Sequence, residues 1–160
     1  MMGAVHIRDR THVDLQPCVD LLRAVHLANR YPTRWPEDPQ AWLSPTGLLT
    51  ALVAAEEIEI VGHVAATEFG PRGGDVVELS RLFVSPEHRR HGVGAGLVEA
   101  VVDFARQRRS GLVLVVVDDR SGTLTFYERQ GWRFTGRSSA GWRLADGSQP
   151  TLAHFEYPYR

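Results

Sequence analysis

The chain has 160 residues, which suits one domain over residues 1–160 that is large enough to bury a core. Its net charge of −1 argues against a nucleic-acid or anionic-membrane partner. The single cysteine, Cys18, excludes an intrachain disulfide and a cysteine-rich zinc site. Because no signal-peptide pattern opens the chain and Leu112–Val117 is too short for a membrane span, we expect a cytoplasmic protein.

Apolar residues recur at helical or alternating spacing through the N-terminal half. They predict a strand at Ala4–Arg8, a helix from a cap at Asp14 to Leu27, a short helix at Pro39–Leu43, and a hairpin of Leu49–Ala55 with Glu59–Phe69. Asp38 supports the short helix, because aspartate suits the N-cap and proline suits the first helical turn. An irregular, proline-rich stretch, 29–46, surrounds that helix.

The C-terminal half alternates strand and helix patterns. The predicted elements are a strand ending at Val84, a helix running to Arg109, a strand at Leu112–Val117, a helix at Ser121–Arg129, and strands at Trp132–Thr135 and Leu152–Tyr157. The all-apolar run Leu112–Val117 is typical of a strand covered on both faces. The fold class is therefore α/β with a mixed, mostly antiparallel sheet.

The segment between Val84 and the following helix predicts a phosphate-binding loop. Arg89 and Arg90 precede glycines at 92, 94 and 96, just where the helical pattern starts. Glycines let backbone N–H groups approach a ligand, and a helix N-terminus attracts anions. A Walker loop is excluded because no Gly-Lys-Ser/Thr follows. The dinucleotide fingerprint is disfavoured because Leu97 replaces its third glycine and Gly92 lies eight positions after Val84.

Three segments in order resemble the GNAT superfamily of N-acetyltransferases. They are Arg89-x-x-Gly92-x-Gly94, the strand-like run 78–86, and Phe126-Tyr-Glu-Arg-Gln-Gly-Trp132, and together they cover roughly residues 76–134. The resemblance implies a sheet of six to seven strands with about four helices, splayed between the fourth and fifth strands. It also implies acetyl-CoA as co-substrate. His88-x-x-His91 offers two potential metal ligands but no third, so we expect no metal. The residues implied to hold acetyl-CoA are Leu82, Phe83, Val84, Arg89, Arg90, His91, Gly92, Val93, Gly94, Ala95, Gly96, Ser121 and Tyr127.

Acetyl transfer to an amine requires a base for the ammonium proton, donors for the carbonyl oxygen and an acid for the thiolate. The resemblance implies Glu78 as the base and Tyr127 as the acid. Each has a simpler interpretation: Glu78 as a solvent-facing or Arg81-paired acid, and Tyr127 as a core tyrosine. The asparagine that many relatives use for the pantetheine arm is Arg120 here, and whether Arg120 or Ser121 replaces it stays open.

The acceptor is predicted to be a small-molecule or peptide amine. Tyr31 and Trp35 lie in the irregular stretch with Glu37, and aromatic rings beside acids suit a cation. Anchoring the loop to the core would explain the tryptophans equally well. His63 and His154 could also neighbour this site. A non-catalytic acyl-CoA sensor, another nucleotide ligand, a longer acyl donor and a homodimer remain open alternatives.

Overall fold

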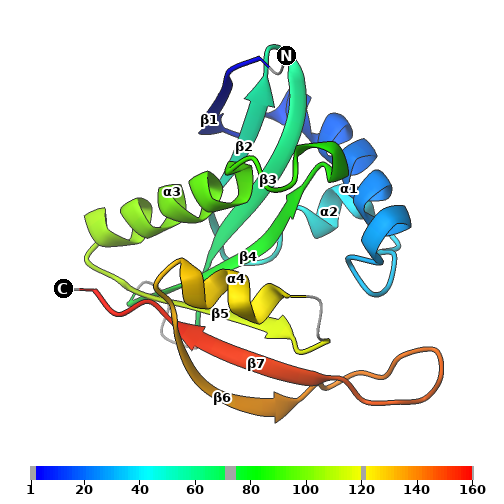
Figure 1. Ribbon diagram of the computed structural model, residues 1–160, viewed down its shortest axis with the longest axis vertical. Helices are drawn as coiled ribbons and strands as arrows, with labels where there is room; N and C mark the ends of the chain where they lie inside the picture. Colours follow the sequence, from blue (N-terminus) through cyan, green and yellow to red (C-terminus); the bar gives the residue numbers. More distant parts are fainter. Residues whose placement is uncertain (1–2, 71–74, 120–121, 160) are drawn as a thin grey trace.

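The computed structural model describes residues 3–70, 75–119 and 122–159, and its elements follow the predicted order. Figure 1 shows the arrangement. The strands are β1 (Val5–Asp9), β2 (Leu48–Glu56), β3 (Glu59–Glu68), β4 (Val76–Val84), β5 (Gly111–Val117), β6 (Arg133–Ser139) and β7 (Thr151–Glu156). The helices are α1 (Leu15–Asn29), α2 (Pro39–Trp42), α3 (Val93–Gln107) and α4 (Thr123–Arg129), with 3-10 turns η1 (His12–Asp14) and η2 (Pro86–His88).

The seven strands form one sheet in the order β1-β2-β3-β4-β5-β7-β6. Every neighbouring pair is antiparallel except β4 and β5. The parallel ladder runs only from Val76↔Gly111 to Glu78↔Val113. Beyond Glu78 the two strands separate, so the predicted splay between the fourth and fifth strands is confirmed, as is the mixed, mostly antiparallel class.

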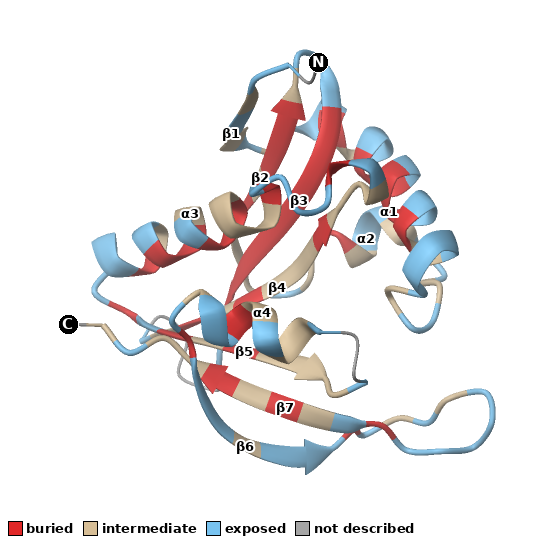
Figure 2. Ribbon diagram, viewed as in Figure 1, coloured by how far each residue is buried: buried red, intermediate tan, exposed pale blue. Residues whose placement is uncertain are grey.

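Helices cover the two faces of the sheet and create two apolar cores. The α3-side core joins buried residues of α3, such as Leu97 and Val101, to β3, β4, β5 and β7. The α1-side core joins Leu22 of α1 to β2 and to Phe83 of β4. Figure 2 shows the buried stripes of α1 and α3 turned toward the central strands. Val93, Leu97 and Val101 follow one another along the buried face of α3, and each is at most 5% exposed.

Close approach of α3 to the sheet depends on Gly62 of β3. A Cβ atom at Gly62 would lie 2.9 Å from Leu97 Cδ1 and 3.1 Å from Val93 Cγ1. Both distances are shorter than ordinary carbon–carbon contact. Gly62 therefore sets how near the first turns of α3 come to β3.

A β-bulge changes which way the side chains of β4 point. The β3–β4 register shifts between His63↔Phe83 and Ala65↔Ser80, and Arg81 has φ +54°. Val77 and Leu79 belong to the α3-side core, but Phe83 belongs to the α1-side core. In a regular strand, residues 79 and 83 would share a face. The bulge therefore reverses the alternation between Leu79 and Phe83.

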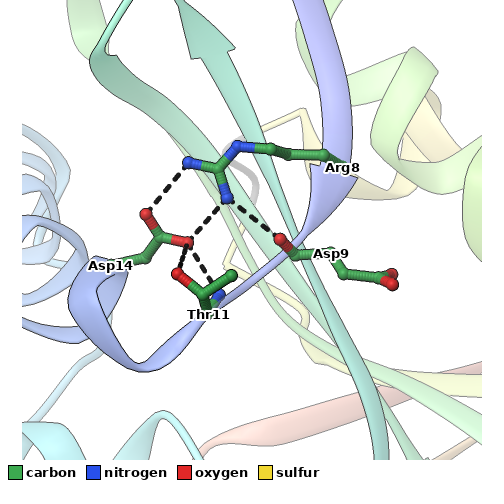
Figure 3. A network of polar contacts seen from close by, with 4 residues as sticks. All are labelled: Arg8, Asp9, Thr11 and Asp14. Atoms are coloured by element: carbon green, nitrogen blue, oxygen red, sulfur yellow. Dashed lines mark hydrogen bonds and ion pairs between the residues drawn. The ribbon is translucent and has the colours of Figure 1, made fainter.

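An ion pair between Arg8 and Asp14, the N-cap residue of α1, holds the junction of β1 and α1. Asp14 is 5% exposed, and its carboxylate accepts hydrogen bonds from Arg8 Nη1 at 2.7 Å and Nη2 at 3.0 Å (Figure 3). The Thr11 amide also donates to it at 2.7 Å. Asp14 makes no side-chain cap bond to α1. Asp14 therefore occupies the predicted N-cap position of α1, but its carboxylate is bonded to Arg8 and Thr11 rather than to the first amides of the helix.

Two other predictions need correction. Strand β5 is not covered on both faces, since Leu112 and Leu114 are buried but Val113 and Val115 are only half-buried. The final hairpin is longer on its first strand than predicted, because β6 continues to Ser139. The short helix after Asp38 is confirmed, and the Asp38 carboxylate accepts the Ala41 amide at 3.1 Å. Within the described ranges, no helix is both long and apolar enough to cross a membrane.

Candidate functional site

The predicted phosphate-binding loop connects η2 to α3. Arg90 and Gly92 both have left-handed backbones, with φ of +64° and +80°. Gly92 is the N-cap of the 15-residue α3 and supplies no side chain to bond the first helical amides. Those amides lack intrahelical acceptors and carry the positive end of the helix dipole. Arg89, Arg90 and His91 are exposed beside them.

Gly94 brings the three predicted segments together. A Cβ built on Gly94 would lie 3.6 Å from Val84 Cγ2 and 3.6 Å from Phe126 Cζ. The end of β4, the first turn of α3 and helix α4 therefore meet at this point. Open amides and two arginines beside a glycine N-cap fit a diphosphate. Val93, Ala95 and Gly96 complete this first turn, whereas Ser121 lies outside the described residues.

The splay leaves one edge of β4 without β5. In the segment Leu82–Val84, Phe83 and Val84 pair with β3 on one side, but the β4–β5 ladder has already ended at Glu78. Backbone groups on the β5 side of this segment are thus open to an extended ligand chain, as a peptide-like pantetheine arm requires. The predicted contact strand and the predicted loop are therefore contiguous.

Glu78 lies where the ladder ends, half-buried on the sheet face opposite Val77 and Leu79. Burial raises the pKa of Glu78 above its usual value, and the charges of Arg81 and His154 partly offset that effect. A raised pKa brings a carboxylate closer to the strength a general base needs near neutral pH. His154, on β7, accordingly lies near enough to act electrostatically on Glu78, and its Nε2 is 2.7 Å from Ser138 Oγ.

Tyr127, on α4, is only 3% exposed and lies in the α3-side core. Its ring meets Trp132 and Phe155 with centroid distances of 5.8 Å and 5.9 Å. Burial raises the pKa of Tyr127, and Tyr31 raises that pKa further. Tyr31 itself packs against the α1-side core. The hydroxyl of Tyr127 is protonated at neutral pH.

Arg81 extends over α2 from the bulge. Its Nε donates to the Trp42 carbonyl at 3.0 Å, and its guanidinium carbon lies 4.3 Å from the centroid of the Trp42 ring. Trp42 and Phe83 form an aromatic cluster with Tyr31 at centroid distances of 6.1–6.5 Å. Sequence reasoning considered Arg81 only as a partner for Glu78. However, no ion pair joins the two residues in the described part of the chain.

His63 was predicted as a strand residue that could neighbour the acceptor site, and the structure places it in β3. The side chain is completely buried and stacks on Phe83 at 5.0 Å. Its Nδ1 lies 2.9 Å from the Arg81 carbonyl oxygen and its Nε2 3.0 Å from Arg10 Nη1. Burial lowers the pKa of His63 to about 4. The sequence signal for this position was the apolar run 60–66 around the histidine, since a histidine buried in such a run needs hydrogen-bond partners.

The predicted acceptor residues separate into two places. Tyr31 lies beside Trp42 and Phe83, near β4. Trp35 packs instead on α1, with Arg23 4.6 Å above its ring and His26 5.4 Å away. Glu37 is exposed. In the parts of the chain that the structure describes, no cluster of three potential metal ligands occurs.

The sequence and the fold both have close parallels among known proteins. The family described as Acetyltransferase (GNAT) family matches residues 15–132. N-acetyltransferase 8 of Mus musculus is 38% identical over 112 residues, covering 66% of this chain and 48% of that protein. Mycothiol acetyltransferase of Rhodococcus jostii is 30% identical over 97 residues, 58% of this chain and 32% of that protein. This chain thus spans about half, or less, of the length of these relatives.

Two solved structures show the same fold. The ribosomal-protein-alanine N-acetyltransferase of Brucella melitensis has a TM-score of 0.78 at 22% identity, covering 96% of this chain and 99% of that one. A Salmonella typhimurium protein solved with its cofactor acetyl-CoA has a TM-score of 0.74 at 19% identity, with 96% and 93% coverage. The family match covers most of the chain and includes the splay, the loop and α4, so this chain belongs to the acetyltransferase (GNAT) family.

Proposed function

We propose that this protein is an N-acetyltransferase that moves the acetyl group of acetyl-CoA to a primary amine by direct attack in a ternary complex. One observation carries the proposal: three features meet at Gly94. They are the N-terminus of α3, which has no side-chain cap, the open edge of β4, and helix α4 with Tyr127. Membership of the GNAT family supports acetyl-CoA as the donor.

The donor-binding part of the site would be built from the loop and the strand edge. Amides of the first turn of α3, with Arg89 and Arg90, would hold the diphosphate, because charge-assisted bonds to phosphate are the strongest contacts available there. Backbone groups of residues 82–84 would pair with the amides of the pantetheine arm. Together they would place the thioester at the splay, between Glu78 and Tyr127.

Glu78 would accept the proton that an ammonium substrate must lose before its nitrogen attacks. Burial supports this role by raising the pKa of Glu78, since a stronger base holds the proton better. Tyr127 would donate a proton to the departing thiolate. Its burial supports that role because it keeps the hydroxyl protonated. Backbone donors freed at the splay would stabilise the carbonyl oxygen during attack.

Calorimetric titration with acetyl-CoA tests the donor site, using wild type and Gly94→Glu. The new carboxylate would enter the space between Val84 and Phe126 and repel the diphosphate, so we expect micromolar wild-type binding to be lost. Gly141→Glu is the matched control, because Gly141 is exposed with no heavy atom within 4 Å of its Cβ position. Unchanged binding by Gly94→Glu would place the diphosphate elsewhere.

Glu78→Gln tests the base through the pH dependence of thiol release. The amide keeps the shape of the side chain but cannot take a proton, so turnover should fall most at low pH, where free amine is scarcest. An unchanged pH–rate profile would remove Glu78 as the base. Tight acetyl-CoA binding without thiol release to any amine would favour the alternative, a non-catalytic acyl-CoA sensor.

A further inference from the structure

Arg81 is held rigidly but leaves two donor groups unused. Its Nε is bonded to the Trp42 carbonyl, and its guanidinium lies on the Trp42 ring. Within residues 3–70, 75–119 and 122–159, its terminal nitrogens Nη1 and Nη2 make no hydrogen bond or ion pair. A fixed guanidinium with both terminal amino groups free matches the two oxygens of a carboxylate.

The backbone of Arg81 is fixed as well. His63 donates to the Arg81 carbonyl from Nδ1, and Arg10 fixes the other side of the imidazole. These bonds hold the bulge at φ +54°, where the chain reverses its alternation. Side chains three apart point to opposite faces of a regular strand. With the bulge, Arg81 instead contacts Trp42, which packs against the α1-side core, so Arg81 lies on the same face as Glu78.

Glu78 and Arg81 therefore lie on one face of β4, near enough for the charge of each to affect the pKa of the other, and among the described residues no ion pair joins them. Both are partly buried, and burial disfavours the charged form of each, lowering the pKa of Arg81 and raising that of Glu78. Ionised groups in such surroundings gain most from a partner of opposite charge. An acceptor with an ammonium and a carboxylate close together would complement both residues.

We propose that the acceptor is a free α-amino acid, or a derivative that keeps its α-carboxylate, with Arg81 binding that carboxylate. This inference rests on the proposed function, since it names the substrate class of the same site. The amine would face Glu78, and the aromatic cluster of Tyr31, Trp42 and Phe83 would border the rest of the molecule. In the reaction a nitrogen–carbon bond replaces the carbon–sulfur bond of the thioester, and the carboxylate of the acceptor stays unchanged. The ammonium gives one proton to Glu78 before attack, CoA leaves with a proton from Tyr127, and the second proton lost by the nitrogen restores Tyr127. Peptide N-termini and simple alkylamines lack this carboxylate and would be poor acceptors.

Matched acceptors test this selectivity through thiol release from acetyl-CoA. Each set contains an amino acid, its carboxamide and its decarboxylated amine: for example L-phenylalanine, L-phenylalaninamide and phenethylamine, and the corresponding leucine set. Sets with small, basic and acidic side chains extend the series. The carboxamide has the less basic amine, so a preference for the acid cannot come from easier deprotonation. Wild type should prefer the acid in kcat/KM by about tenfold or more.

Variants assign the preference to Arg81. Arg81→Gln should bring the acid-to-amide ratio close to one, and Arg81→Lys should leave an intermediate ratio, since it keeps the charge but loses the planar fork. Arg23→Gln is the matched control, because Arg23 also lies over a tryptophan but on the exposed side of α1. It should keep the wild-type ratio. Acetyl-CoA binding by each variant checks that the variant is folded. The acid-to-amide ratio of the wild type tests the substrate class even if no variant folds.

The outcomes separate the substrate class from the reaction. Equal use of acid and amide by wild type, or a preference that survives Arg81→Gln in a folded protein, would overturn the role of Arg81. Turnover of alkylamines alone would do the same while leaving the N-acetyltransferase function intact. No thiol release with any amine, despite acetyl-CoA binding, would overturn both proposals.

Discussion

Replacement of His63 by Gln tests whether a neutral imidazole holds the bulge of β4. Arg10 can only donate hydrogen bonds, so His63 Nε2 must accept from it and Nδ1 must carry the hydrogen given to the Arg81 carbonyl. Protonation of Nε2 would direct an N–H at the guanidinium. Gln offers one donor and one acceptor as well, but it does not titrate.

The size of the effect follows from the pKa of His63. Burial lowers that pKa from 6.5 to about 4, and the charges of Arg10 and Arg81 lower it too, against the opposing effect of the Arg81 hydrogen bond. Between these two values the unfolded chain binds more protons than the folded protein, so stability falls as pH falls from 6.5 toward 4. Over the interval from pH 7 to pH 4.5, the free energy of unfolding should drop by about 2 kcal/mol from this group alone.

Urea unfolding of wild type and His63→Gln at pH 7 and pH 4.5 measures this contribution. Wild type should lose about 2 kcal/mol more than the variant between the two conditions. The raised pKa of Glu78 acts in the opposite direction, but it is common to both proteins and cancels. A constant loss of stability in the variant does not matter, because only the change with pH is compared. Equal pH dependence in the two proteins would refute a buried neutral imidazole.

Three other substitutions have defined outcomes. Asp14→Asn should lower the free energy of unfolding by about 1–2 kcal/mol at pH 7, a modest value because the Arg8 side chain is 39% exposed. Arg8 holds the pKa of Asp14 well below its usual range, so the difference in unfolding free energy between wild type and variant should shrink below about pH 4. Urea titrations measure this difference, and a difference that does not change with pH would contradict the pairing. Gly62→Ala should lower the free energy of unfolding by about 1–2 kcal/mol through overpacking against α3, whereas Gly141→Ala should not. Equal melting temperatures of wild type and Gly62→Ala would show that α3 can move to make room for the methyl group. Tyr127→Phe should lower kcat by about 10²-fold with unchanged acetyl-CoA affinity, and wild-type turnover would mean that Tyr127 only packs.

The order of the elements and the glycine loop before α3, which we propose as the donor site, were predictable because their signals are local. Helix α3 follows from apolar residues at three- and four-residue spacing, and its N-terminus follows from glycines at 92, 94 and 96. Strand β4 and helix α4 were recognised from short segments on either side of that helix. Each of these features depends on backbone conformation and periodicity within a few residues.

The face of β4 that we propose for the acceptor depends on contacts that sequence spacing does not encode. Glu78 and Arg81 would face apart on a regular strand, and only the bulge places them together. That bulge is held by His63 and Arg10, 18 and 71 positions before Arg81 in the chain. Trp35 was grouped with Tyr31 because they are neighbours in sequence, yet one packs on α1 and the other near β4. The chain by itself determined the fold and the donor loop, whereas packing of distant segments decided which charges meet at the splay, because a single extra residue in a strand reverses every side chain beyond it.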